Sequence, residues 1–344
     1  MSGDEGTGAP ARAVATGVGS MPGDDDTAYA EALRVVLGEL AAPDGLPHLP
    51  ELPTRSAGST MTGRALAVVE GLAADLQPAG WRLTDREGVD QRRARSQLSR
   101  DLDQLEEQAQ GLTGAFKVQV AGPWTLAATV ERPRGDRVLA DHGARRDLAQ
   151  SLAAGLEGHL ADVRRRLPGV DRLVVQVDEP TLAAVLAGSV PTASGFHRHR
   201  SVDQPEASAA LTWVLDAVTA AGAEPWVHTC AAGTPLGLLR GAGARGLSVD
   251  LALASPADHD VLATALEAGE TVALGVLPGV DPDHRPSDRE TTEQVLRWLD
   301  MLGLDPAACG GRLVVTASCG YAGASPAWVR AALTTLRSTA RNLS

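Results

Sequence analysis

Short apolar runs alternate with helix-like segments along almost the whole chain, and this alternation restricts the fold more than any other feature. Eight runs have the length of a β-strand: residues 13–18, 46–52, 116–120, 172–177, 225–229, 247–251, 271–276 and 312–317. Most are continuously apolar, as expected for parallel strands buried on both faces. The segments between them carry helix start signals, such as Ser325 followed by Pro326. The sequence therefore predicts an α/β fold.

Eight strands, each followed by a helix, are the number required for a (β/α)8 TIM barrel. A doubly wound sheet is the competing architecture. The first strand-to-helix turn contains Gly17 and Gly19 but lacks the third glycine of a dinucleotide-binding fingerprint. We therefore expect a single-domain barrel over residues 13–344, preceded by a disordered tail over residues 1–12.

One stretch, residues 78–110, does not follow the alternation. It contains Trp81 and then a dense mixture of charges, with Leu98, Leu102 and Leu105 at helical spacing. Its apolar content is too low for a separate domain. We predict a helical excursion inserted between the second and third strands.

Composition excludes several classes of function. The formal net charge of −12 argues against nucleic-acid binding, which needs a basic surface. Neither a signal peptide nor an apolar run of membrane-spanning length is present, so we expect a cytoplasmic protein without a membrane partner. Three cysteines fit a reducing compartment, where thiols stay free to bind metal. Lys117 is the only lysine, which we interpret as compositional bias.

The strongest chemical signal is the pair His228 and Cys230 at the end of a predicted strand. Residues two apart on a strand point the same way, and imidazole and thiolate are ligands that zinc prefers. A lone pair of this kind is more often structural than metal-binding. Cys319 follows the last strand, and Asp250 ends the strand between them, so a barrel would bring all four to one mouth. We predict a Zn²⁺ site formed by these four residues.

Alternatives exist for two members of this set and for the remaining cysteine. Cys319 could be a small buried apolar residue, and Asp250 could cap the next helical segment. Cys309 precedes its strand, so it belongs to the opposite face of the barrel and is expected to be non-functional.

Other polar residues also lie at strand ends. Asp178 could hold a cationic group such as a substrate ammonium, or else be a helix-start carboxylate. Glu51 could serve the same ammonium, and Ser20 could receive a carboxylate, although turns also favour such residues. His284 is a candidate proton relay or a solvated loop residue, and the His197 and His199 cluster is expected on the surface.

Six motifs, in order along the chain, carry a resemblance to a known family. They are Gly19-Ser20-Met21-Pro22, Pro50-Glu51-Leu52-Pro53-Thr54-Arg55, Ala121-Gly122-Pro123-Trp124-Thr125, Gln176-Val177-Asp178-Glu179-Pro180, His228-Thr229-Cys230 and Ser318-Cys319-Gly320. From about residue 13 to residue 340 the chain resembles the catalytic domain of cobalamin-independent methionine synthase.

The resemblance implies a barrel whose zinc binds homocysteine as a thiolate for methyl transfer. It implies His228, Cys230 and Cys319 as zinc ligands, and Ser20, Glu51 and Asp178 as contacts to the amino-acid end of homocysteine. Asp178 and His284 are then the candidate catalytic residues. Asp250 stands where the family has a glutamate ligand.

The methyl donor stays open at this point. Full-length plant and bacterial members have a second, N-terminal barrel that helps to bind a polyglutamylated folate. The present chain resembles short archaeal forms that take the methyl group from a corrinoid carrier. The donor is therefore expected to be methyltetrahydrofolate or methylcobalamin on a corrinoid protein.

Two other functions compete with methyl transfer. A uroporphyrinogen-decarboxylase-like enzyme would need a basic cleft and no zinc, and the net acidity and the histidine–cysteine pair argue against it. A non-catalytic relative could bind zinc or an amino acid. The presence of Ser20, Glu51 and Asp178 together favours the enzyme.

Overall fold

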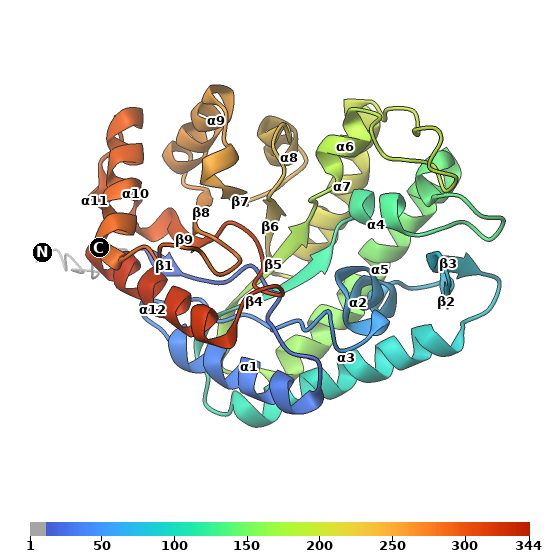
Figure 1. The fold of residues 1–344 in the computed structure, drawn as a ribbon, viewed down its shortest axis with the longest axis horizontal. Helices are drawn as coiled ribbons and strands as arrows, with labels where there is room; N and C mark the ends of the chain where they lie inside the picture. The colour runs from blue at the N-terminus through green and yellow to red at the C-terminus, as the bar shows by residue number, and fades with distance from the viewer. Residues whose placement is uncertain (1–11) are drawn as a thin grey trace, which may run out of the picture.

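A curled parallel sheet forms the centre of the protein, in a computed structural model that describes residues 12–344 (Figure 1). Its strands are β1 (Val14–Ala15), β4 (Gly114–Ala121), β5 (Val170–Asp178), β6 (Glu224–Thr229), β7 (Gly246–Asp250), β8 (Thr271–Leu277) and β9 (Leu313–Ala317). They pair in the order β1-β9-β8-β7-β6-β5-β4. Each coincides with a predicted run, so the α/β class and seven of the eight predicted strands are confirmed. The predicted tail lies, apart from Arg12, outside the described residues.

The prediction of a regular strand over residues 46–52 is wrong. Pro47 and Pro50 have no N–H group to donate to a neighbouring strand, which prevents a continuous ladder. Residues 45–51 instead make isolated parallel bridges, Ala15↔Gly45, Ser20↔Glu51 and His48↔Lys117. It thus contacts both edge strands of the sheet, β1 and β4, but residues 12–344 do not show a complete eight-stranded barrel.

Helices follow the strands and cover the outside of the curled sheet (Figure 1). They are α1 (Asp26–Glu39), α2 (Met61–Val68), α4 (Pro123–Thr129), α5 (His142–Arg166), α6 (Leu182–Leu186), α7 (Gln204–Ala220), α8 (Leu236–Gly241), α9 (Pro256–Glu267), α10 (Asp288–Leu302), α11 (Pro306–Cys309) and α12 (Pro326–Asn342). The predicted start of α12 is confirmed, because Ser325 accepts the N–H of Trp328 and Pro326 occupies the first turn. No helix of residues 12–344 combines the length and apolarity needed to cross a membrane.

The predicted helical excursion over residues 78–110 is partly wrong. Its first part belongs to an antiparallel hairpin of β2 (Ala73–Gln77) and β3 (Gly80–Thr84), and only the second part is a helix, α3 (Val89–Gln108). The sequence pattern does not predict this hairpin, because its strands are short and mixed in polarity. Gly80 begins β3 directly after the two-residue turn 78–79, with a φ of 123° that favours glycine. The three leucines at helical spacing do form the buried face of α3.

Alternating side chains of the strands fill the inside of the curled sheet. An inner apolar cluster contains Leu46, Val174, Trp226, Ala273 and Val314. Residues two positions further along the same strands point the same way. This places Gln176 and His228 one step nearer the carboxyl ends of their strands, where the apolar filling gives way to polar groups.

Candidate metal centre

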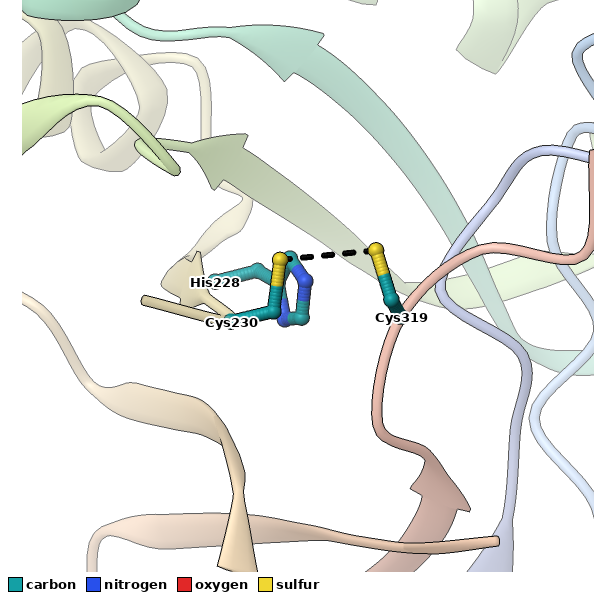
Figure 2. A group of neighbouring side chains, drawn as sticks. All are labelled: His228, Cys230 and Cys319. Carbon is teal, nitrogen blue, oxygen red and sulfur yellow. Dashed lines mark hydrogen bonds between the residues drawn. The ribbon is translucent and has the colours of Figure 1, made fainter. Parts of the chain in front are cut away.

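His228, Cys230 and Cys319 converge at the carboxyl ends of two strands that are not neighbours in the sheet. His228 lies in β6 with Cys230 directly after it, whereas Cys319 lies in the loop after β9. The potential ligand atoms of the three residues lie within 4.8 Å of one another. Figure 2 shows the two sulfurs facing each other beside the imidazole, with the sulfurs 3.4 Å apart. The sequence prediction that these three side chains meet is confirmed.

The arrangement fits a tetrahedral zinc ion. Two sulfurs at about 2.3 Å from such an ion are ~3.8 Å apart, close to the spacing found here. Nδ1 of His228 lies 3.0 Å from the Ser248 hydroxyl, which fixes the ring. The other nitrogen, Nε2, is buried and has no hydrogen-bond partner within residues 12–344. A buried ring nitrogen without a partner is costly, and a metal ion bound to the unprotonated Nε2 would satisfy it.

The two thiols have opposite acidities because they lie so close together. The hydrogen bond with Cys230, followed by the influence of the His228 side chain, lowers the pKa of Cys319 to about 4. The same hydrogen bond, with burial, raises the pKa of Cys230 far above its usual range. The close approach of the two sulfurs therefore favours ionisation of Cys319 over ionisation of Cys230.

Asp250, the proposed fourth ligand, does not join this group. Its carboxylate accepts the N–H of Ala252 at 3.0 Å and caps the short 3-10 helix Leu251–Leu253. With Cys230 it lines a separate small cavity of about 20 Å³. The capping role raised as an alternative is thus present, and ligation by Asp250 stays a prediction.

One cavity of about 170 Å³ adjoins the three converging residues. Its lining also contains each predicted contact to an amino-acid substrate. The full lining is Val18, Gly19, Ser20, Glu51, Met61, Gln119, Asp178, Pro180, His228, Cys230, Cys319 and Gly320. The structure therefore brings the three converging residues and polar side chains from three other segments of the chain into a single space.

Backbone bonds hold the loops around this cavity in place. The N–H of Tyr321 donates to the Ser20 carbonyl at 2.8 Å, and the N–H of Met21 donates to the Glu51 carbonyl at 2.8 Å. A Cβ on Gly320 would lie 1.9 Å from the Ser20 hydroxyl, so any larger residue here would displace the Ser20 side chain from its position. Ser20, Glu51 and the Cys319 loop are thus mutually positioned.

Asp178 is buried at the end of β5 with a specific partner. Its Oδ1 accepts a hydrogen bond of 2.7 Å from Nε2 of Gln176. Burial raises the pKa of Asp178 to about 7. A ligand ammonium would compensate that burial, since an adjacent positive charge favours the ionised carboxylate.

Glu51 is buried and supported from behind by an ionic network. Arg64 Nε donates to its Oε1 at 3.1 Å, and Arg64 also donates to Asp101 at 2.7 Å. Asp101 lies on α3 and accepts two further bonds of 2.8 Å from Arg55. Burial raises the pKa of Glu51, while the Arg64 charge acts in the opposite direction. This network therefore connects α3, through Asp101 and Arg64, to Glu51 at the cavity.

Comparisons with known proteins identify the family of the chain. Residues 107–342 match the family model described as the catalytic domain of cobalamin-independent synthase. The chain belongs to the cobalamin-independent methionine synthase family. Membership indicates a methionine synthase-like enzyme. No curated protein matches the sequence.

One solved structure supports the fold. A B12-independent methionine synthase from Shewanella sp. W3-18-1, solved with selenomethionine, is similar at 15% identity and a TM-score of 0.62, over 97% of this chain and 98% of that one. An endo-β-1,4-mannanase from Cellulomonas fimi is similar at 14% identity and a TM-score of only 0.38, over 70% of this chain and 58% of that one.

The remaining predicted residues of this methionine synthase-like protein lie elsewhere. His284 has a side chain that is 76% exposed, and its Nε2 lies 3.1 Å from Glu290, so the structure does not bring it to the cavity. His197 is exposed as expected, whereas His199 is buried 3.3 Å from Asp136. Cys309 is buried at the end of α11, away from the other cysteines.

Several residues at the site were missed by sequence reasoning. They are Lys117 and Gln119 on β4, and Gln176, two residues before the predicted Asp178 on β5, and all three are buried. Polar residues spaced by two within otherwise apolar strands were the available signal. Arg64 carried no such signal, because a single arginine in a helical segment is ordinary.

Proposed function

We propose that the protein transfers a methyl group to the thiol of homocysteine, forming methionine, with a zinc ion bound by His228, Cys230 and Cys319. The observation that carries the proposal is the single cavity shared by these residues and by Ser20, Glu51 and Asp178. A thiol-binding metal beside an amino-acid pocket suits homocysteine, which has a thiol at one end and an amino acid at the other.

The metal ligands act on the thiol end of the substrate, and the other polar residues of the cavity bind its amino-acid end. When bound, zinc supplies the positive charge that lowers the pKa of a substrate thiol from its usual value near 8.5, so that it reacts as a thiolate. Three protein ligands leave a fourth position for that sulfur. Glu51 and Asp178 hold the ammonium group, and Ser20 receives the carboxylate. These contacts orient the sulfur toward the donor.

The test is a methyl-transfer assay with the zinc-loaded protein and a panel of donors. Methyltetrahydrofolate with one or several glutamates is compared with methylcobalamin, and methionine is the measured product. Methionine formed from homocysteine with any of these donors supports the proposal, and the preferred donor identifies the carrier. Zinc-loaded, folded protein that forms no methionine with any donor would contradict it.

Substitution of Asp178 tests the ammonium contact. In D178N the charge-assisted hydrogen bond to the ammonium is lost, which corresponds to about a 10–100-fold rise in the homocysteine KM. Zinc content should stay at the wild-type level, since Asp178 is not among the three converging ligands. The matched control is D171N, at the exposed start of the same strand, which should leave the KM unchanged. Equal KM values for D178N and wild type would exclude this contact.

A further inference from the structure

Lys117 is the only lysine of the chain, and it lies in the interior of the curled sheet rather than on the surface. Its side chain is fully buried, and its Nζ donates to the Val18 carbonyl and to Oε1 of Gln176, both at 2.8 Å. Gln119, the next residue on the same face of β4, lines the cavity. Lys117 therefore lies one step beneath the cavity floor, and compositional bias does not explain its position.

Gln176 connects Lys117 to the cavity. An ammonium group can only donate hydrogen bonds, so the amide oxygen of Gln176 must face Lys117. The amide NH₂ then points the other way, where it donates to Asp178 Oδ1 at 2.7 Å and to the Val18 carbonyl at 2.9 Å. With Oδ1 held in this way, the second oxygen of Asp178 is left for a ligand.

The electrostatics around Lys117 also connect it with the carboxylates of the cavity. Burying a cation costs free energy unless nearby groups compensate for it, and burial lowers the pKa of Lys117 to about 7. The carboxylates of Asp178 and Glu51 oppose this effect and favour the charged ammonium. Lys117 thus balances part of the negative charge that a substrate ammonium would meet.

We propose that Lys117 is a positioning residue, which sets the direction of the Gln176 amide and through it holds Asp178 ready for the ammonium group of the amino-acid substrate. The inference rests on the proposed function, because it takes an amino acid as the ligand. It assigns Lys117 and Gln176 to recognition of the amine rather than of the thiol.

The test compares two thiols on zinc-loaded protein by calorimetry: homocysteine and 4-mercaptobutyrate, which lacks only the amino group. K117M should weaken homocysteine binding by about 10-fold, the effect of one misplaced hydrogen bond to a charged group. Binding of 4-mercaptobutyrate should change by less than about twofold, because its sulfur and carboxylate contacts do not involve Asp178. Equal losses for both thiols would show a merely structural role and overturn the inference.

A double-mutant cycle tests the route through Gln176. If Lys117 acts through this amide, Q176L should weaken homocysteine binding less in the K117M background than in the wild type. Additive effects of the two substitutions would contradict that route. Wild-type zinc protein that binds neither thiol would instead reject the proposed function, so the two failures are distinguishable.

A second measurement needs no variant. Since Lys117 is the only lysine, protein labelled with ¹³C-lysine gives a single Cε signal, which reports on this side chain alone. Saturating homocysteine should shift this signal, and saturating 4-mercaptobutyrate should shift it much less. A signal that moves equally with both thiols, or with neither, would overturn the inference even if K117M failed to fold.

Discussion

Replacing either Cys230 or Cys319 by serine is expected to remove zinc and, with it, methyl transfer. Wild-type protein should hold about one zinc per chain, since residues 12–344 contain one group of three converging ligands. Loss of an outer-shell partner of a metal site costs about 10–100-fold in affinity or activity, so loss of a thiolate ligand should cost at least ~100-fold. Metal content by elemental analysis and initial rates of methionine formation measure the two effects.

Cys309 provides the matched control for these substitutions. It is a third free thiol of the same chain, buried in α11 and separate from the converging group. C309S should retain zinc and activity. A C230S or C319S protein that is metal-free yet as active as wild type would refute the role given to the metal.

Replacing Asp101 by asparagine should cause the largest loss of stability. Asp101 is fully buried and accepts hydrogen bonds from Arg55, Arg64 and Gln97. Removing one partner of a buried ionic network leaves uncompensated charges, which costs about 3–5 kcal/mol. Arg64 would also lose one of its two hydrogen-bond partners, Asp101, and would position Glu51 less firmly. The homocysteine KM should therefore rise as well.

The control for this prediction lies two residues further along the same helix. Asp103 is 61% exposed and pairs with Arg166 at 2.7 Å, so D103N should change the free energy of unfolding by at most about 1 kcal/mol. Urea unfolding followed by circular dichroism measures both variants. Equal stabilities of D101N and D103N would contradict the structural role assigned to the network.

The sequence predicted those features that depend on local pattern. Continuous apolar runs correctly located seven strands, and strand-end positions correctly predicted that His228, Cys230 and Cys319 would meet. The predictions that were wrong concern segments whose sequence pattern is compatible with two different structures. The run over residues 46–52 is apolar enough for a strand, but Pro47 and Pro50 lack the N–H groups that a continuous ladder of hydrogen bonds needs.

Long-range partners could not be predicted from single residues. Nothing local indicates that Arg64 would connect Glu51 to Asp101 on the excursion helix, because that contact depends on how α2 and α3 pack. Lys117 was interpreted as compositional bias, and its buried position with a hydrogen bond to Gln176 became visible only in the structure. Asp250 shows the same limit, since capping and ligation favour the same residue type at the same strand end.

Proton release on homocysteine binding tests the central claim most directly. Calorimetric titrations of zinc-loaded protein, at neutral pH in buffers with different heats of ionisation, give the number of protons released. If the substrate thiol becomes a metal-bound thiolate, close to one proton should be released per homocysteine. Methionine carries the same ammonium group but has no thiol proton, so it measures any release from Asp178, and homocysteine should release close to one proton more than methionine. Tight binding of homocysteine without any proton release would contradict the proposal that the metal takes up the substrate sulfur.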